Sequence, residues 1–422
     1  MKKSVCILIS LLVLIACFLT SCNNGGEEFP NTYKVNYCTD MQIMYLCGGG
    51  SISVPMTKSD TGYYYLGRGI EGTRIVIYID KESKKATPLC SKPNCMHDDI
   101  ELCDAYVKSS ETVSIDTMFG ATGNLIQYYK GSLYLLCGEY DESFINYNSY
   151  IMKMNLDGSN REKVTNYFDF SVKYWCMHRG YLYYLTDSTL CRVPEASLDS
   201  EPEIIYKAEY FIENGRNTFD YLYAYENYIY FSVNEKDDKG NGEGMKSYCI
   251  NLDTLEKTEI KIGTEHAIVQ GFLDNKVIVT CADDNGRIFE ITDLDGKNGK
   301  QFLTNEQIGD NSFTNDGTYL YLDNAMYAAK NKEQQTITVL DNQFNEIDTF
   351  RLPQIDLKVY NFFAPQDEDF FIFECFNEND EHIIVMADKS QIGSINGEVI
   401  QYTELCKLKW ATKNSNGIYY TE

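Results

Sequence analysis

The sequence predicts an all-β fold, a β-propeller of seven blades with four antiparallel strands in each. Three observations predict it: a strand-like run recurs at a nearly regular interval, a second run follows each first one, and no segment shows convincing helical periodicity. The composition agrees, because the 422-residue chain has 34 Tyr and only 8 Pro. Aromatic residues favour strands, whereas proline does not.

Each first run is a turn residue followed by aromatic and aliphatic residues. The runs start at Gly62, Gly131, Gly180, Asn227, Asn275, Gly317 and Asp369. Their spacings are 69, 49, 47, 48, 42 and 52 residues, with a mean of about 51. Short strands at this period are typical of propeller blades, whereas solenoid repeats are shorter and mostly helical. The tail from Asn416 either begins an eighth unit or helps to close the ring, so six or eight blades stay open as alternatives.

The second runs begin at Arg74, Tyr150, Leu190, Tyr248, Arg287, Thr336 and His382. Each pair of runs is a hairpin that cannot bury both faces alone, so we expect the hairpins to stack as blades around a central axis. The stretch YIMKMNLDGSNREKVT, from Tyr150, resembles the repeat of the periplasmic Tol-system propellers and related exported propellers, in which a strand ends in Asp-Gly. This resemblance is local and implies a fold rather than an activity.

Residues 1–21 have the layout of an export signal. Lys2 and Lys3 precede a mostly apolar run that ends at Leu19 and is too short for a membrane-spanning helix, which needs ~20 apolar residues. The following Thr-Ser-Cys22 resembles the bacterial lipobox, and the resemblance implies that Cys22 is diacylglycerylated and becomes the first residue after cleavage. The alternative is an ordinary signal peptide that happens to end in Cys, but such cleavage sites favour Ala-x-Ala-like residues.

Residues 22–33 are polar and contain glycine, and we expect a flexible tether there. Residues 34–422 are then a single propeller domain, held by its lipid on the extracytoplasmic face of a bacterial cell membrane. Without the signal, 35 basic residues face 62 acidic ones, a net charge of −27. Such a surface repels phosphate backbones, so the composition argues against nucleic-acid binding. We expect a monomer.

Fifteen cysteines are unusual for an exported chain, where disulfides are the rule. Cys137, Cys281 and Cys375 each lie six residues after the start of their repeat. Equivalent positions in non-adjacent blades point away from one another, and a disulfide needs Cα atoms within ~7 Å. We therefore expect these three not to pair with one another but to pack as small buried hydrophobes, and we predict a reducing or anaerobic habitat.

The first repeat is longer than the others, which predicts an insertion at about residues 88–110. It contains Cys90, Cys95, His97 and Cys103. Three thiolates and an imidazole are a donor set of tetrahedral structural zinc, which leaves no open position for catalysis. The Cys-x-His spacing is tight for a shared metal, so a local disulfide with one remaining thiol is an equal alternative, and free thiols are a third.

The pattern Cys-x-Lys-Pro-x-Cys-x-His followed by Cys-x-Ala resembles one that recurs in uncharacterised exported bacterial propeller lipoproteins, which implies a class of protein and no reaction.

Other motifs give weaker evidence of a functional site. Gly67–Gly72 matches GxGxxG, but no helix follows to receive a pyrophosphate, so we expect a hairpin turn. The acidic stretches 237–242 and 293–297 lack the alternation of a calcium loop and are expected to be hairpin tips. His178 and His382 are predicted to be turn or edge residues, and His266 shows no ligand spacing.

The preferred function is therefore a non-enzymatic binding or scaffold propeller that recognises a protein, peptide or glycan through loops at one end of the axis. The alternative is an extracellular carbohydrate-active hydrolase or lyase, in which carboxylates from several blades would converge at the axial mouth. A purely structural envelope component is a third class. The sequence identifies no ligand-binding residue.

Overall fold

The computed structural model divides the chain into two compact units, Met1–Asn31 and Thr32–Glu422. The residues that the structure describes all lie in the second unit: 34–47, 53–68, 73–107, 123–140, 147–168, 172, 174–186, 188–208, 219–236, 242–263, 265–283, 286–304, 312–324, 335–352, 357–365, 369–377, 382–408, 411–413 and 416–418. The expected export signal, Cys22 and the tether lie outside them. Among these residues no helix is long and apolar enough to cross a membrane.

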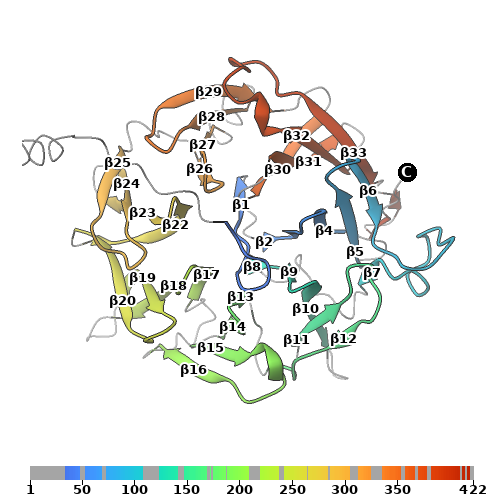
Figure 1. The fold of residues 1–422 in the computed structure, drawn as a ribbon, viewed down its shortest axis with the longest axis horizontal. Helices are drawn as coiled ribbons and strands as arrows, with labels where there is room; N and C mark the ends of the chain where they lie inside the picture. The colour runs from blue at the N-terminus through green and yellow to red at the C-terminus, as the bar shows by residue number, and fades with distance from the viewer. Residues whose placement is uncertain are drawn as a thin grey trace, which may run out of the picture. The chain divides into compact units, whose positions relative to one another are not determined.

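Seven antiparallel sheets stand around a central axis as the blades of a β-propeller (Figure 1). The innermost strands are β3 (Met56–Lys58), β9 (Ile126–Tyr129), β13 (Tyr174–His178), β17 (Phe219–Tyr225), β22 (Ile268–Leu273), β26 (Ser312–Asn315) and β30 (Leu357–Pro365). The second strands are β4 (Gly62–Arg68), β10 (Ser132–Tyr140), β14 (Tyr181–Leu185), β18 (Tyr228–Lys236), β23 (Lys276–Asp283), β27 (Leu320–Asp323) and β31 (Phe370–Asn377).

The third strands are β5 (Arg74–Asp80), β11 (Tyr147–Met154), β15 (Thr189–Pro194), β19 (Gly242–Asn251), β24 (Gly286–Thr292), β28 (Thr336–Leu340) and β32 (His382–Asp388). The outer strands are β6 (Lys85–Pro88), β12 (Glu162–Lys163), β16 (Glu203–Lys207), β20 (Lys257–Ile262), β25 (Lys300–Thr304), β29 (Glu346–Arg351) and β33 (Tyr402–Leu408). The remaining short strands are β1 (Met44–Cys47), β2 (Ser53–Val54), β7 (Tyr106–Val107), β8 (Gly123–Asn124), β21 (Glu265–His266), β34 (Ala411–Lys413) and β35 (Asn416–Ile418).

The fold class and the blade count are confirmed. Every predicted first run is the second strand of a blade, and every second run is the third strand. The tail does not start another blade, because β34 pairs only with β35 in a separate two-stranded sheet.

The turn residues that mark the repeat sit between the first and second strands of the blades. Lys130 and Gly131 both have positive φ angles, and so do Arg179 and Gly180. Two consecutive positive φ values define the tight hairpin turn whose twist matches that of antiparallel strands. Glycine is favoured there because it adopts positive φ without steric cost. The sequence period is therefore a period of hairpin turns at one end of the ring.

Apolar side chains fill the space between adjacent blades. One cluster joins Tyr183 and Leu190 of blade three to Phe231 and Ile250 of blade four, and all four side chains are buried. Burying a large apolar side chain contributes roughly 1.5–3 kcal/mol, so each sheet is stabilised by the next one around the ring.

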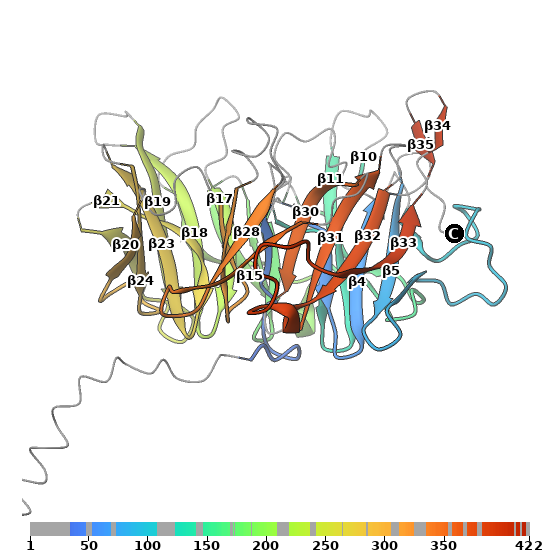
Figure 2. The same cartoon turned by 90° about the horizontal axis from the view of Figure 1, so that it is seen from above.

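An N-terminal segment that the repeat did not predict closes the ring. Residues 36–47, which we call the strap, cross the end of the ring that carries the first hairpin turns (Figure 2). The last part of the strap is β1, which pairs antiparallel with β30 and so joins the start of the folded chain to the seventh blade. The remaining part contacts blades one to four.

The contacts of the strap are specific hydrogen bonds. The amide side chain of Gln42 donates to the carbonyl oxygen of Lys58 at 2.6 Å and accepts from its N–H at 2.7 Å. The Lys130 N–H donates to the Tyr37 carbonyl oxygen at 3.0 Å, and the Ala224 N–H donates to the Met41 sulfur at 3.3 Å. Polar residues of the strap are therefore buried but satisfied, as an interior requires.

The prediction for His178 was correct in part, because β13 is the edge strand of its sheet, but the side chain does not lie at the surface. His178 ends β13, is fully buried, and holds the strap instead of lying in a turn. Its Nδ1 accepts from the Met41 N–H at 2.8 Å, and its Nε2 lies 2.8 Å from the carbonyl oxygen of Glu226. This pattern requires a neutral ring with the proton on Nε2. Burial lowers the pKa of His178 to about 4, which keeps the ring neutral near pH 7.

Candidate metal centre

The Cys/His insertion interrupts the outer strand of blade one. Both β6 and β7 pair antiparallel with β5, and they flank Val76 of that strand. The Val76 carbonyl oxygen accepts from the Leu89 N–H at 2.8 Å, and its N–H donates to the Ala105 carbonyl oxygen at 2.8 Å. Residues 89–105, which we call the Cys/His loop, thus leave the sheet and return to it at a single position (Figure 1).

Turns rather than regular strands shape the Cys/His loop. Asn94 and His97 have positive φ angles of 59° and 56°, so the chain reverses on both sides of Cys95. The Asp99 carboxylate accepts from the N–H groups of Glu101 and Leu102 at 2.8 and 3.1 Å, which forms a local turn. These reversals bring residues that are distant in an extended chain to one point.

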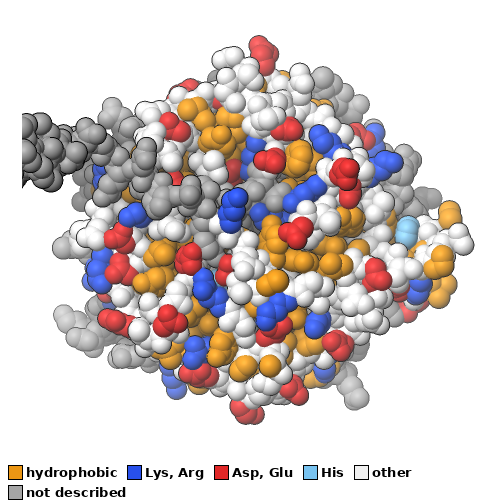
Figure 3. Space-filling model, in the orientation of Figure 1, with side chains coloured by type: hydrophobic (Ala, Val, Ile, Leu, Met, Phe, Trp, Pro, Cys, Tyr) orange, Lys and Arg blue, Asp and Glu red, His pale blue; other side chains and the backbone are white. Residues whose placement is uncertain are grey.

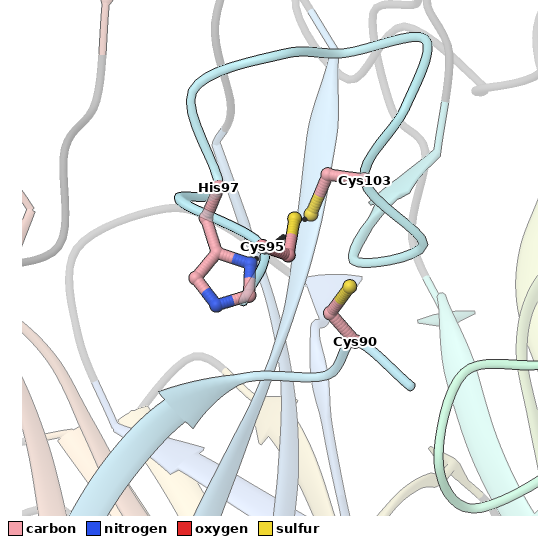
Figure 4. Close-up of side chains that lie close together, drawn as sticks. All are labelled: Cys90, Cys95, His97 and Cys103. Atoms are coloured by element: carbon pink, nitrogen blue, oxygen red, sulfur yellow. Dashed lines mark hydrogen bonds between the residues drawn. The ribbon is translucent and has the colours of Figure 1, made fainter. Parts of the chain in front are cut away.

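The four predicted ligands converge. The ligand atoms of Cys90, Cys95, His97 and Cys103 all lie within 4.8 Å of one another (Figure 4). His97 Nδ1 lies 3.2 Å from the Cys103 sulfur. Tetrahedral zinc with bonds of about 2.0–2.3 Å would separate its ligand atoms by roughly 3.3–3.8 Å, close to this arrangement. The group could therefore hold a metal ion, and it is the only such group of His, Cys, Asp or Glu among the described residues.

The thiols of the cluster differ in electrostatics. Burial would raise the pKa of Cys90, but the backbone N–H groups of Lys92 and Asp104 and the two neighbouring thiols outweigh it, and the pKa is lowered. Burial and the neighbouring sulfurs raise the pKa of Cys103 to about 12. The surroundings therefore stabilise the thiolate of Cys90 and disfavour that of Cys103. A bound cation would favour the thiolate of Cys103 as well, because metal ligation deprotonates thiols.

The backbone of His97 is held by the blade itself. The buried Tyr106 of β7 donates its hydroxyl to the His97 carbonyl oxygen at 2.9 Å. Cys103 is also buried, and its sulfur accepts from the Ala105 N–H at 3.4 Å. The inner half of the cluster is thus held by the sheet, whereas Cys90 and Cys95 are partly exposed.

The Cys/His loop also contacts blade two. The Arg161 guanidinium donates to the carbonyl oxygens of Asp104 and Tyr106. Gly158, with a φ of +84°, lies so close that a Cβ would come within 2.4 Å of the Leu89 carbonyl oxygen. Lys92 forms an ion pair with Asp104 at 2.9 Å across the base of the loop. The loop is therefore fixed at its base.

The remaining sequence predictions have clear outcomes. Cys137, Cys281 and Cys375 are buried as predicted, and no disulfide joins any of the eleven cysteines whose side chains the structure describes. Gly67 lies in β4, which pairs with β5, so no helix follows the GxGxxG match. Asp293 and Asp295 bond Lys276, Lys297 and Asn298 at a hairpin tip. Most of the stretch 237–242 lies outside the described residues.

Three described carboxyl groups have raised pKa values, the signal expected of a catalytic site. Burial is the main cause for Glu226, Asp274 and Glu290. Glu226 bonds Arg179 at 2.8 Å, and Asp274 accepts from the Asn342 amide at 2.9 Å. These partners lower the two pKa values and only partly offset the effect of burial, so burial of separate carboxyl groups explains the raised values without a shared catalytic site.

Comparisons with known proteins support the fold. No protein-family model matches the chain, and no curated protein matches it in sequence. Among solved structures, a prolyl endopeptidase matches with a TM-score of 0.51 at 12% identity, over 87% of this chain and 50% of that one. A post-proline cleaving enzyme from Rickettsia typhi matches with a TM-score of 0.49 at 9% identity, over 86% and 56%.

The computationally designed Ika8 protein matches with a TM-score of 0.45 at 8% identity, over 92% of this chain and 95% of that one. The chain spans about half the length of the peptidase structures named above. At 12% identity, the match to the prolyl endopeptidase shows a propeller fold and carries no information on activity.

Proposed function

We propose that this protein is a lipid-anchored propeller on the extracytoplasmic face of a bacterial membrane, and that it binds a protein, peptide or glycan without catalysis. The anchor is Cys22, supported by the lipobox-like end of the apolar run. The extracytoplasmic location follows from the export signal.

One observation supports the binding function: the fourth strand of a blade ends, and the first strand of the next blade begins, at the end of the ring opposite the strap. At the strapped end, first and second strands are joined by short turns, as between β9 and β10 or between β13 and β14. The described ends of β16 and β17, of β25 and β26, and of β27 and β28 lie at the opposite end, where one blade is connected to the next or a second strand to a third. Loops presented around one axis by a rigid scaffold are the usual place for recognition.

Catalysis is the weaker alternative. It requires carboxylates from several blades around one mouth, whereas burial explains the raised pKa values among the described residues, and two of these three groups have partners of their own. The peptidase neighbours share the fold, not a demonstrated site. A screen against glycans, peptidoglycan fragments and peptides tests both functions if it measures binding and product release together. We expect binding without turnover, and product release would overturn the non-enzymatic proposal.

The anchor is tested by growing the producing bacterium with an alkyne-labelled fatty acid. We expect label on the wild-type protein and none on a Cys22→Ala variant. Label on both proteins would show that the lipid is attached to another residue. Label on neither would show that the protein carries no lipid anchor.

We also propose that Cys90, Cys95, His97 and Cys103 hold one structural zinc ion. The convergence of all four donors supports zinc over a disulfide, because a disulfide would use two thiols and leave a third thiol and the imidazole without a role. Zinc supplies no chemistry here beyond closing the Cys/His loop, since all four positions are taken by the protein. Metal analysis of protein purified without oxygen tests this.

We expect one zinc per chain in the wild type and in Cys38→Ser, which changes an exposed cysteine outside the cluster. Cys95→Ser should lose the metal. Absence of zinc from the wild type, or its retention in Cys95→Ser, would contradict the proposal.

A further inference from the structure

The strap determines where the folded domain is joined to the preceding chain. The carbonyl oxygens of Tyr37 and Thr39 accept from the backbone N–H groups of Lys130 and Arg179. The Tyr37 ring also stacks edge-on against Tyr128 at 5.6 Å. Lys130 and Arg179 lie in the hairpin turns at the strapped end. The chain therefore enters the domain at that end.

We infer that the strapped end of the ring faces the bilayer and that the opposite end faces outward. The inference deepens the proposed function and rests on the lipid at Cys22. Its partner is the surface of the membrane that holds this lipid. The consequence is that the end of the ring where successive blades are connected is the surface presented to a ligand.

Chain length supports this orientation whatever conformation the linking residues adopt. From Cys22 to Asn36 is a step of 14 residues, because 36 − 22 = 14. At ~3.3–3.6 Å per residue the chain spans at most about 46–50 Å. The strapped orientation requires only a small part of that reach.

The inverted orientation would require almost all of that reach. The chain would have to cross a blade of four strands, about 14 Å at ~4.8 Å per strand gap. It would then run the length of β18, whose nine residues span about 30 Å. The total of about 44 Å leaves no allowance for side chains, so only a nearly straight chain could achieve it. Holding a chain straight costs conformational entropy at every residue.

The charged side chains at the strapped end do not predict an electrostatic attraction of this end to the bilayer. Its cations bond neighbouring acids: Lys130 with Glu195, Arg179 with Glu226, Lys276 with Asp293, and Lys297 with Asp295. Positive and negative side chains are interspersed on this face (Figure 3). The covalent lipid alone should hold the face near the bilayer, and the orientation should persist at high salt.

Two exposed cationic residues of blade five form a matched pair for the test. Lys297 lies at the turn after β24, where the Asp293 N–H donates to its carbonyl oxygen, and Arg287 lies at the start of β24. They are therefore at opposite ends of the same strand, and both are exposed. A genetically encoded azido residue at either position would carry a donor dye in the full lipidated protein.

The protein is bound to vesicles that contain lipids with an acceptor dye on the headgroup, and energy transfer is measured at low and high salt. We expect transfer from position 297 to exceed that from position 287 by about twofold or more, because β24 separates them by about 20 Å. Equal or reversed transfer by vesicle-bound protein would overturn the orientation. Failure of wild type and Cys22→Ala alike to co-sediment with vesicles would instead overturn the anchor, and the orientation with it.

Discussion

The strap and the Cys/His loop are two additions to the same repetitive ring, held in opposite ways. The strap is buried from Asp40 to Ile43 and bonds backbone groups of four blades before pairing with a fifth. The Cys/His loop leaves the ring at one position and folds around four side chains. Met96 is 79% exposed and Leu102 is 64% exposed, which shows how little apolar burial the loop has.

The difference shows that a segment without a core needs a local cross-link, whereas a segment inside the ring needs only packing and satisfied polar groups. Loss of the strap should therefore affect the whole domain. Loss of the cluster should affect mainly the loop.

The largest expected effect is an aspartate in the strap. Ile43 is 3% exposed and belongs to a core cluster shared with blades three and four. An unpaired buried carboxylate should cost about 3–5 kcal/mol, so Ile43→Asp should unfold at much lower urea or fail to fold. Urea unfolding followed by tyrosine and tryptophan fluorescence measures it. A change below about 1 kcal/mol would mean that the strap is not part of the cooperative core.

Sequence reasoning found the Cys/His loop and missed the strap for a physical reason. The loop's ligands are close in sequence, from Cys90 to Cys103, so their spacing is visible. The strap's partners are remote: Met41 bonds His178 across 137 positions and Ala224 across 183. Nothing in one sequence marks such pairs. Asp40 and Gln42 look like solvated residues, yet both are buried.

The blades show the same contrast. The second and third strands are buried between neighbouring blades. Their continuous apolar runs made the repeat recognisable in the sequence. The outer strands are short or partly exposed, as in the fully exposed β12, so their pattern is weak. The connections between the strands follow no period, so neither the repeat nor its turns could predict whether they bind a ligand.

The second largest effect should be a loss of stability in acid, caused by protonation of His178, which holds the strap. The pKa of His178 falls from 6.5 unfolded to about 4 folded, so the unfolded chain binds the extra proton between these values. Stability should be unaffected by this group above pH 6.5 and should fall as the pH drops to about 4, with a total loss of about 3 kcal/mol.

Urea unfolding at several pH values, compared with His178→Gln, isolates this contribution because the variant has no group that titrates there. Parallel pH profiles for the two proteins would show that His178 does not titrate in this way.

The metal cluster should have a moderate and local effect. Cys95→Ser, or removal of the metal with a chelator, should lower the free energy of unfolding by about 1–2 kcal/mol, because the loop interrupts only an outer strand. Amide hydrogen exchange should accelerate within residues 89–105 and remain unchanged in β13. Cys38→Ser is the control. Faster hydrogen exchange throughout the ring would show that the cluster stabilises the whole domain. The Cys/His loop would then not differ from the strap in this respect.

The smallest effect should come from repeating the aspartate substitution on the loop. Met96 lies between the ligands Cys95 and His97 but is mostly exposed, so its side chain contributes little burial. Met96→Asp should change stability by less than about 0.5 kcal/mol and should retain the zinc, whereas Ile43→Asp should be severe. Comparing the same substitution in the two segments therefore shows whether each segment is stabilised by burial of its side chains or by the cluster of Cys and His side chains. A large loss with the metal retained would mean that Met96 packs against a surface in solution, and the loop would then resemble the strap more than the present contrast allows.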